Sequence, residues 1–355
     1  MWSGADQLFC ESVKGKLRVN KVIDIVVPWV DGSDPKWCEE KKDWYSKVNP
    51  DGKSNSNTRY QSWDNLKYWF RAVEKYMPWF HKVYFITYGH LPDFLKLDNP
   101  RLKVVRHEEY IPAEYLPTFN SHTIELNLHR IQELGENIIY FNDDMFPLQP
   151  VEEDYYYQND HVCDEAVETP IIPQFFGSIA KFTWNVRALN MAVINKHFNK
   201  REVQKANYDK WFSDSYGELL DRNKSLSYWD NFVGIRDPHV PSALKKSTFE
   251  KIWEAEPDIL RETCETKFRN FSGVNQWLVR YWQLCEGNFI PRRTHGKSYT
   301  VAIDNCKEIA DVIRRQEQPM ICINEDCTPE EFEQIKSVIN SAFEELLPEK
   351  STFEK

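Results

Sequence analysis

The sequence contains no long hydrophobic run. Among its 355 residues, no stretch approaches the ~20 consecutive apolar residues of a membrane-spanning helix. The N-terminus also lacks the basic segment and apolar core of a secretory signal. We therefore expect a cytoplasmic protein, whose contact with the inner face of the cell membrane would be peripheral.

A surplus of basic residues is missing as well, since the formal net charge is -10. Nucleic-acid-binding proteins carry a basic surface, so we expect no nucleic-acid partner. An anionic small substrate remains compatible with this charge, because a few convergent arginine, lysine or histidine side chains are enough to bind it.

Closely spaced cysteines of the kind that indicate a disulfide framework are also lacking. The eight cysteines are scattered along the chain, which predicts reduced and mostly structural thiols. Cys322 and Cys327 lie close together but have no second pair nearby, so they form only a weak zinc motif. Internal repeats and low-complexity tracts are absent too. Aromatic residues, in contrast, make up 14% of the chain, enough for a large aromatic core or for stacking platforms under sugar rings.

One stretch organises the chain: the apolar, β-prone residues 138–141 are followed by Asn142, Asp143 and Asp144. A buried strand of this kind would deliver two carboxylates to the carboxyl edge of an α/β sheet, where such folds bind ligands. Adjacent carboxylates beside an apolar strand are costly unless a cation or a donor neutralises them. A divalent metal bound to a substrate diphosphate is therefore one interpretation. The other is that Asn-Asp-Asp caps the next turn.

Strands and helices alternate up to residue 150. We predict strands over 22–30, 81–87, 102–105 and 138–142, and helices over 36–48, 62–77 and 121–134. Ser62 is the expected N-cap of its helix, and Glu125 and His129 would lie one turn apart on the face of theirs. This alternation predicts an α/β fold with a largely parallel, Rossmann-type sheet.

The pattern changes beyond residue 150. Residues 151–235 show no clear strand alternation, which predicts a mostly helical insertion with a helix near 184–198. Further elements are expected as helices over 242–266, 274–285 and 329–347, and as a strand over 319–323.

Four blocks of sequence, taken in order, carry a family resemblance. The first is IDIVVPWVDGSD at 23–34, and the second runs in segments from Arg59 to Asp144. The third lies in segments within 238–269, and the fourth is ICINED at 321–326 with the helix after it. Together they resemble the Stealth family of sugar-phosphate transferases. That family includes bacterial capsular and exopolysaccharide phosphotransferases and the α/β subunits of the animal N-acetylglucosamine-1-phosphotransferase.

Some features depart from the animal members of this family. Pro28 and Asp31 stand where the animal enzymes carry other residues, and the large regulatory insertions of those proteins are absent. A short chain of this kind suits a bacterial enzyme of capsule or cell-surface polysaccharide synthesis.

The resemblance implies a reaction and a fold. A hexose 1-phosphate or N-acetylhexosamine 1-phosphate would pass from a nucleotide sugar of the UDP type, such as UDP-N-acetylglucosamine, to a hydroxyl group of a glycan or lipid-linked oligosaccharide. A phosphodiester would form and nucleoside monophosphate would leave. The fold would be a GT-A-like mixed sheet flanked by helices, with Mg²⁺ or Mn²⁺ as cofactor. Its parts would be a lead-in (1–20), a nucleotide-sugar-binding half (21–150), an acceptor-side insertion (151–235) and a C-terminal part completing the catalytic domain (236–355).

The resemblance also assigns catalytic roles. Asp144, with Asp143, would hold the metal. His239 would be the general base on the acceptor hydroxyl, and Arg269 would present a permanent charge to the phosphates. Glu125 would orient the acceptor or His239, or join the metal shell.

Further residues are assigned to substrate binding. The turn at Asp31 and Gly32, with Arg59 and Asn65, would cradle the nucleotide. The remaining candidates for substrate binding are His129, Arg130 and Asn142.

Each assignment has a structural alternative. A histidine between two prolines can be a simple loop residue, Arg269 can pair with Glu262 or Glu265, and Glu125 with His129 can be a surface helix pair.

Two other functions are compatible with the sequence. An ordinary GT-A glycosyltransferase would move the sugar alone and release UDP. A non-catalytic carbohydrate-binding protein would bind glycan without metal, although it would have no need for acidic strand ends, a clamped histidine and an arginine together.

Overall fold

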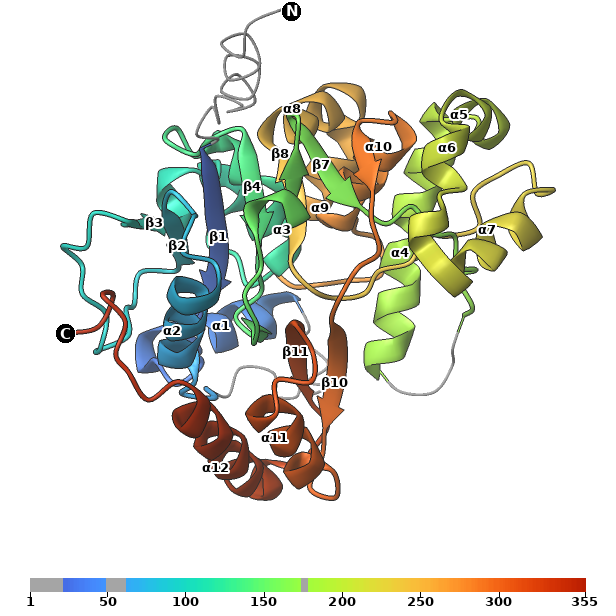
Figure 1. Ribbon diagram of the computed structural model, residues 1–355. Coiled ribbons are helices and arrows are strands. Elements are labelled where there is room, and N and C mark those ends of the chain that lie inside the picture. The colour runs from blue at the N-terminus through green and yellow to red at the C-terminus, as the bar shows by residue number, and fades with distance from the viewer. Residues whose placement is uncertain (1–21, 49–61, 174–177) are drawn as a thin grey trace, which may run out of the picture.

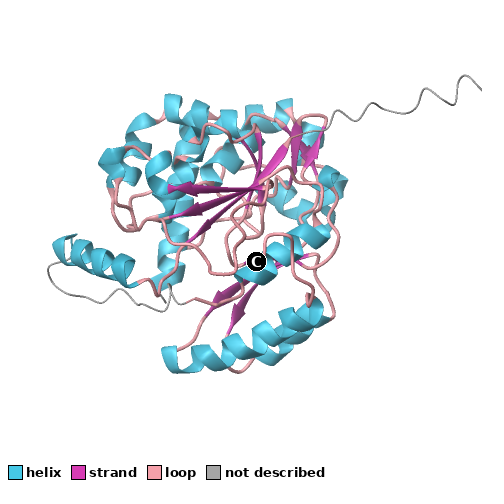
Figure 2. Cartoon of the chain, turned by 90° about the vertical axis from the view of Figure 1, so that its left-hand side faces the viewer, coloured by secondary structure: helices cyan, strands magenta, loops and turns pink. Residues whose placement is uncertain are grey.

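The computed structural model describes residues 22–48, 62–173 and 178–355, so the expected lead-in lies outside the described residues. Its main sheet has five strands in the order β3-β2-β1-β4-β8, with helices on both faces (Figures 1 and 2). The strands are β1 (Ile23–Trp29), β2 (Val83–Thr87), β3 (Leu102–Arg106), β4 (Asn137–Tyr140) and β8 (Ser242–Lys245). The first four are parallel and β8 is antiparallel to β4. The predicted α/β fold with a mixed, parallel-rich sheet is confirmed.

The centre of this sheet is the parallel pair β1 and β4. Val26, Ile138 and Ile139 are fully buried, as expected for strands that helices cover on each face. Pairing aligns Val26 with Tyr140, and the Phe141 N–H donates to the Val26 carbonyl oxygen at 2.9 Å. The residues after Tyr140 therefore leave the sheet at its carboxyl edge, where the sequence predicts the acidic pair.

The predicted helix over 242–266 is wrong at its start. Residues 242–245 form β8, and the helices α8 (Lys246–Ala255) and α9 (Pro257–Glu265) follow it. The sequence Ser-Ala-Leu-Lys has no β-branched residue, so its local propensity does not favour a strand. Pairing with β4, which buries Leu244 completely, outweighs that propensity.

Two other predicted helices are shorter in the structure. The first helix, α1, spans Pro35–Val48. The predicted helix over 62–77 corresponds to α2, which spans Leu66–Tyr76 and has Asn65, and not Ser62, at its N-cap. Asp64 has φ of +53°, which is not helical.

α3 spans Ser121–Leu126 and is followed by a 3-10 turn at Leu128–Arg130. The prediction of one helix over 121–134 is wrong, because Asn127 donates its side-chain amide to the Thr123 carbonyl oxygen and ends the helix. Glu125 and His129 therefore do not share a helix face.

The segment 151–235 is mostly helical, as predicted. Its helices are α4 (Ser178–His197), α5 (Lys200–Ala206), α6 (Tyr208–Trp211) and α7 (Leu220–Leu226). The sequence patterns missed the small sheet that joins it to the rest of the fold. That sheet contains β6 (Tyr157–Gln158), β7 (His161–Asp164) and β9 (Phe289–Pro291). The helix α10 (Trp277–Cys285) packs against α4.

A second lobe lies beyond the carboxyl edge of the main sheet. It contains β5 (Met145–Pro147), β10 (Lys297–Val301), β11 (Met320–Glu325), α11 (Cys306–Arg314) and α12 (Pro329–Leu346). β11 is parallel to β10 and antiparallel to β5. In Figure 1 the arrowhead of β1 points toward this lobe. Because β5 begins directly after Asp144, the acidic turn lies between the two sheets.

The C-terminal tail packs back on α2. Arg71 donates through Nε and Nη2 to the Glu354 carboxylate at 2.9 and 2.8 Å, and through Nη1 to the Leu347 carbonyl oxygen at 2.7 Å. The side chains of Arg71 and Glu354 are only 6% and 4% exposed. The pair therefore holds the tail and α12 against the main sheet.

We expect Arg71→Ala to lower the free energy of unfolding by about 3–5 kcal/mol, because it leaves the Glu354 carboxylate buried without its partner. Chemical denaturation measures this change. As a control, Arg201→Ala removes an exposed pair with Asp230 and should cost at most about 1 kcal/mol. Equal effects of the two substitutions would contradict the role given to the buried pair.

Candidate active site

Asp143 and Asp144 lie in the turn between β4 and β5. Asp143 is solvent-exposed. Its pKa is nevertheless raised to about 7, mainly because the protein around the turn reduces the hydration of its carboxylate, and in addition because of the Asp144 carboxylate. Burial likewise raises the pKa of Asp144 to about 7, and Glu325 pushes it in the same direction. Among the described residues Asp144 Oδ1 has no hydrogen-bond partner. The turn therefore gathers negative charge that nothing in the described chain neutralises fully.

His239 and Cys322 lie beside Asp144. One ligand atom of each of these three side chains lies within 4.8 Å of the others. Burial raises the pKa of the Cys322 thiol well above its usual value, and the thiol donates a hydrogen bond to Asp144. Cys322 is thus a protonated donor near neutral pH. Cys327, the other half of the weak zinc motif, is not part of this group.

The donor set at this turn suits a hard divalent cation. Asp143, Asp144 and Glu325 are carboxylates whose charges act on one another, and Mg²⁺ and Mn²⁺ prefer such oxygen ligands. The unpartnered Asp144 Oδ1 is a free coordination position. A cation there would offset both the loss of hydration and the mutual repulsion that raise the two aspartate pKa values.

The backbone at His239 has φ of +52°, a left-handed conformation that is uncommon for residues other than glycine. Its loop is held through the buried Asp237, which pairs with Arg280 and Arg187 at 3.2 Å each. The His239 and Trp277 rings are nearly perpendicular, with their centroids 6.3 Å apart. The loop therefore holds a strained backbone conformation that directs the His239 imidazole toward Asp144.

Burial lowers the pKa of His239, and the Arg269 charge lowers it further, although Asp237 acts in the opposite direction. The imidazole is therefore neutral at neutral pH. A neutral imidazole can accept a proton, as a general base must.

Arg269 and Glu125 meet at the N-terminal turn of α3. Arg269 is exposed and donates through Nε to the Ser121 hydroxyl at 3.0 Å. The alternative prediction was that Arg269 would pair with Glu262 or Glu265; its guanidinium instead contacts Ser121. Glu125 is buried one turn along α3, and burial raises its pKa against the opposing charge of Arg269.

Arg269 acts electrostatically on Glu125, Asp144 and His239 alike. The structure thus brings the four predicted catalytic residues into one electrostatic neighbourhood, from four separate parts of the chain.

The turn after β1 carries Asp31 and Gly32. The Asp31 carboxylate accepts hydrogen bonds from the N–H and hydroxyl of Ser33 at 2.9 and 2.6 Å, while the Asp31 N–H donates to His90 Nε2 at 2.7 Å. The Gly32 carbonyl oxygen accepts from the Cys38 thiol at 3.1 Å. The polar atoms of this turn are thus largely engaged in holding its shape.

A cavity of about 450 Å³ opens beside this turn, where β1, β2 and β3 end. Its lining includes Lys36, His90 and Arg106. The lining also contains the acidic residues Asp34 and Glu108 and the aromatic ring of Tyr88. A cavity at the carboxyl edge of a parallel sheet has the position of a nucleotide site.

Asn65 and Arg59 were predicted to contact the nucleotide. Asn65 is buried at the N-terminus of α2, where its carbonyl oxygen accepts from the N–H groups of Tyr68 and Trp69. Arg59 lies outside the described residues. Asn142 precedes the acidic pair and is half-buried in the same turn.

His129 and Arg130 make their ring contacts with α8. The His129 ring stacks on Phe249, and the Arg130 guanidinium lies over Trp253 at 5.0 Å from the ring centroid. Burial lowers the pKa of His129 to about 4, which leaves the ring uncharged. These contacts put both side chains with α8 and not with the residues around Asp144.

Three members of the site were not assigned from the sequence: Tyr140, Cys322 and Glu325. Tyr140, the last residue of β4, hydrogen-bonds to Glu125. Glu325 ends β11, and the Trp63 indole N–H donates to it at 3.4 Å. A signal for Glu325 was present, because residues 320–325 repeat the pattern of an apolar strand that ends on an acidic turn.

Two family models match parts of the chain. The model of the Stealth protein conserved region 1 matches residues 21–44, and that of conserved region 2 matches residues 59–164. These ranges contain the first two predicted blocks, and the third and fourth remain predictions.

Several curated proteins are similar over nearly the whole chain. The capsular polysaccharide phosphotransferase WcwK of Streptococcus pneumoniae is 40% identical over 94% of this chain and 98% of its own length. The exopolysaccharide phosphotransferase cps2G of Lactiplantibacillus plantarum is 38% identical over 94% and 96%, respectively. The receptor polysaccharide phosphotransferase WefC of Streptococcus oralis is 34% identical over 94% and 99%.

These similarities extend over nearly the whole chain. The chain belongs to the Stealth family.

Proposed function

We propose that this protein transfers a hexose 1-phosphate or N-acetylhexosamine 1-phosphate from a UDP-type sugar to a glycan hydroxyl in the synthesis of a capsular or cell-surface polysaccharide. The observation that carries the proposal is the convergence of Asp144, His239 and Arg269. An acidic turn, a neutral imidazole and a permanent cation are the parts that attack at phosphorus requires. The names of the relatives, which are polysaccharide phosphotransferases, support the same reaction class.

In the proposed step, neutral His239 takes the proton of the acceptor hydroxyl as its oxygen attacks the phosphorus atom attached to the sugar. The bond between that phosphorus and the bridging oxygen of the diphosphate breaks. The sugar phosphate is then joined to the acceptor as a phosphodiester, and UMP leaves with the bridging oxygen. Arg269 offsets the negative charge that grows on the phosphate oxygens, and Glu125 holds the orientation of Arg269 through their opposite charges.

Asp143 and Asp144, with Glu325 beside them, would hold Mg²⁺ or Mn²⁺. A divalent cation in that position supplies Lewis-acid stabilisation of the non-bridging phosphate oxygens. The nucleotide would occupy the cavity beside the Asp31 turn, one strand away from the acidic pair in the main sheet.

None of the helices in the described ranges combines the length and apolarity that a membrane span needs. Our proposal places the protein at the inner face of the cell membrane, where it would meet a glycan or lipid-linked oligosaccharide acceptor by peripheral contact.

The nucleotide that leaves tests this function. Incubation with Mn²⁺, a panel of UDP-sugars and glycan acceptors should release UMP in a metal-dependent manner. His239→Ala removes the base and should slow the release by about 10²–10⁴-fold, and Asp144→Ala should abolish it. The control His161→Ala changes an exposed histidine on β7 and should leave the rate unchanged. Release of UDP would instead identify a glycosyltransferase and withdraw the role of His239.

Metal binding should depend on pH, because a carboxyl group must lose its proton before it binds a cation. With pKa values of about 7, Asp143 and Asp144 are mostly protonated at pH 6 and mostly ionised at pH 8. The apparent affinity for Mn²⁺, followed by electron paramagnetic resonance, should therefore rise about 10- to 100-fold over this range. The rise should level off above pH 8 and be reduced in Asp144→Asn. An affinity that stays constant between pH 6 and 8 would show that these carboxyl groups are not the ligands.

A further inference from the structure

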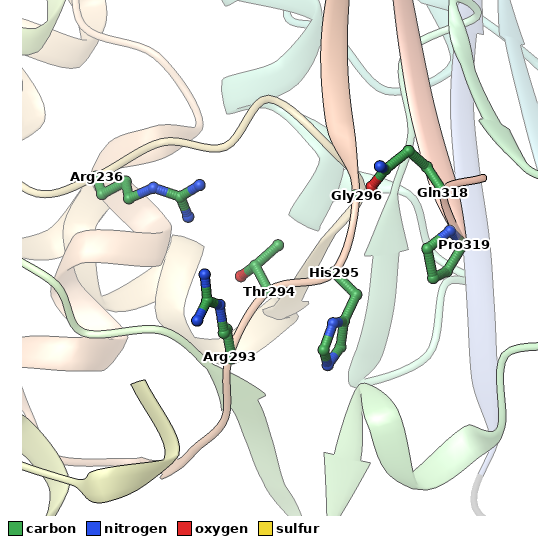
Figure 3. Close-up of a pocket in the computed structure, with 7 residues that line it drawn as sticks. All are labelled: Arg236, Arg293, Thr294, His295, Gly296, Gln318 and Pro319. Carbon is green, nitrogen blue, oxygen red and sulfur yellow. The ribbon is translucent and has the colours of Figure 1, made fainter. Parts of the chain in front are cut away.

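A second cavity, of about 400 Å³, lies between the loop that leads to His239 and the loop that joins β9 to β10. Its lining residues are Arg236, Arg293, Thr294, His295, Gly296, Gln318 and Pro319. Figure 3 shows the guanidinium groups of Arg236 and Arg293 approaching one another from two different loops, while the His295 ring lies on the other side of the β9–β10 loop. The cavity is thus lined by three basic side chains and by no acidic one.

The β9–β10 loop is built to present these groups. Arg292 points away from the cavity and is held by the carbonyl oxygen of Tyr155 at 2.8 Å and its hydroxyl at 2.9 Å. The Thr294 N–H donates to the buried Glu165 carboxylate at 2.9 Å. These contacts fix the backbone of the loop on both sides of Arg293, which lines the cavity.

Each arginine also has one carboxylate partner outside the cavity lining. Arg236 Nη1 donates to Glu165 at 2.5 Å, and Glu165 is fully buried, so this pair fixes the guanidinium in place. Arg293 forms a two-point contact with Glu218, whose side chain is 71% exposed. Because Glu218 is solvent-exposed, its carboxylate regains full hydration when it leaves Arg293, so an incoming phosphate can compete with it for the guanidinium.

The cavity adjoins the proposed reaction centre. Arg236 precedes His239 by three residues in the chain. On the opposite wall, a Cβ atom on Gly296 would lie 3.2 Å from Val240 Cγ1 and 2.7 Å from the Met320 carbonyl oxygen. Val240 is next to His239, and Met320 precedes Cys322 by two residues on β11. The cavity walls therefore continue the two segments that carry His239 and Cys322.

We propose that this cavity binds a phosphate group of the acceptor substrate. The inference rests on the proposed transfer reaction and specifies its acceptor: a glycan that already carries a phosphate ester close to the reacting hydroxyl. Two guanidinium groups that converge on one space match the several oxygens of a phosphate. Such a phosphate could be the diphosphate of a lipid-linked oligosaccharide or a phosphodiester made in an earlier round of transfer.

Binding of a sugar phosphate by the full chain tests this proposal. Isothermal titration calorimetry with α-D-glucose 1-phosphate, in buffer with EDTA so that no metal can recruit the phosphate, should show binding. Methyl α-D-glucopyranoside, which lacks the phosphate, should bind at least about ten-fold more weakly. Arg236→Gln and Arg293→Gln should each weaken binding of glucose 1-phosphate by about 5- to 30-fold, because each removes a charged donor. Unchanged binding in Arg293→Gln would overturn the proposal.

Glu218→Gln separates a binding role from a structural one. It frees Arg293 from a competing carboxylate and should tighten binding of glucose 1-phosphate several-fold, whereas loss of a merely structural pair would not. Because Glu218 and Arg293 lie at the surface, these variants remain informative even if Arg236→Gln fails to fold. The matched control is Arg201→Gln, which breaks an exposed pair on α5 and should leave binding unchanged.

Two competitors distinguish the sources of the phosphate. One is farnesyl diphosphate-linked N-acetylglucosamine, and the other is a disaccharide joined by a phosphodiester. Displacement of glucose 1-phosphate by either one, dependent on Arg293, supports the proposal and identifies the source; displacement by neither contradicts it. UMP release is measured separately. If no donor yields UMP while Arg293-dependent binding persists, the transfer reaction fails and the phosphate site stands.

Discussion

The geometry of the site depends on one buried guanidinium. Arg280, on α10, is 2% exposed and donates to the Asp164 carboxylate at 2.7 and 3.0 Å, to the carbonyl oxygens of Glu165 and Arg236, and to the Asp237 carboxylate. These contacts join the end of β7 to the loop that carries His239. A charge removed from water is retained only when its donors are matched in this way. The loop is therefore fixed by partners from elements far apart in the sequence.

Around this fixed loop, two acidic strand ends face one another across the two sheets. Asp143 and Asp144 follow β4 of the main sheet, and Glu325 ends β11 of the sheet formed by β10, β11 and β5. β5 continues directly from Asp144 and pairs with β11, and the Ile323 N–H donates to the Asp144 carbonyl oxygen at 2.9 Å. The same backbone pairing that connects the lobes therefore sets the spacing of the carboxylates. A cation between them would hold the two sheets together as well as the substrate.

Local patterns predicted a large part of this arrangement. Runs of apolar residues with high β-propensity predicted the strands β1, β2, β3 and β4. The acidic turn after β4 lies where an α/β sheet binds its ligands. The predicted helical insertion and the long C-terminal helix are also confirmed.

The elements that the sequence did not predict have identifiable physical causes. β8 is a strand because of its partner, α3 ends early because Asn127 bonds back to Thr123, and β6, β7 and β9 are too short to show a period. His129 and Arg130 matched a family block, yet their ring contacts are with α8. The proximity of His239, Arg269 and Cys322 to Asp144 depends on long-range contacts, and spacing along one sequence does not encode them.

The pairing of β5 with β11 also has a consequence for the order of events during translation. Asp144 leaves the ribosome long before Cys322 and Glu325, so the nascent main sheet carries its acidic turn without an opposing strand. Strand pairing over so long a loop is slow to form compared with local helices. The group of Asp144, His239 and Cys322 should thus form late, only after β11 has docked, and an unfinished chain would lack the complete site.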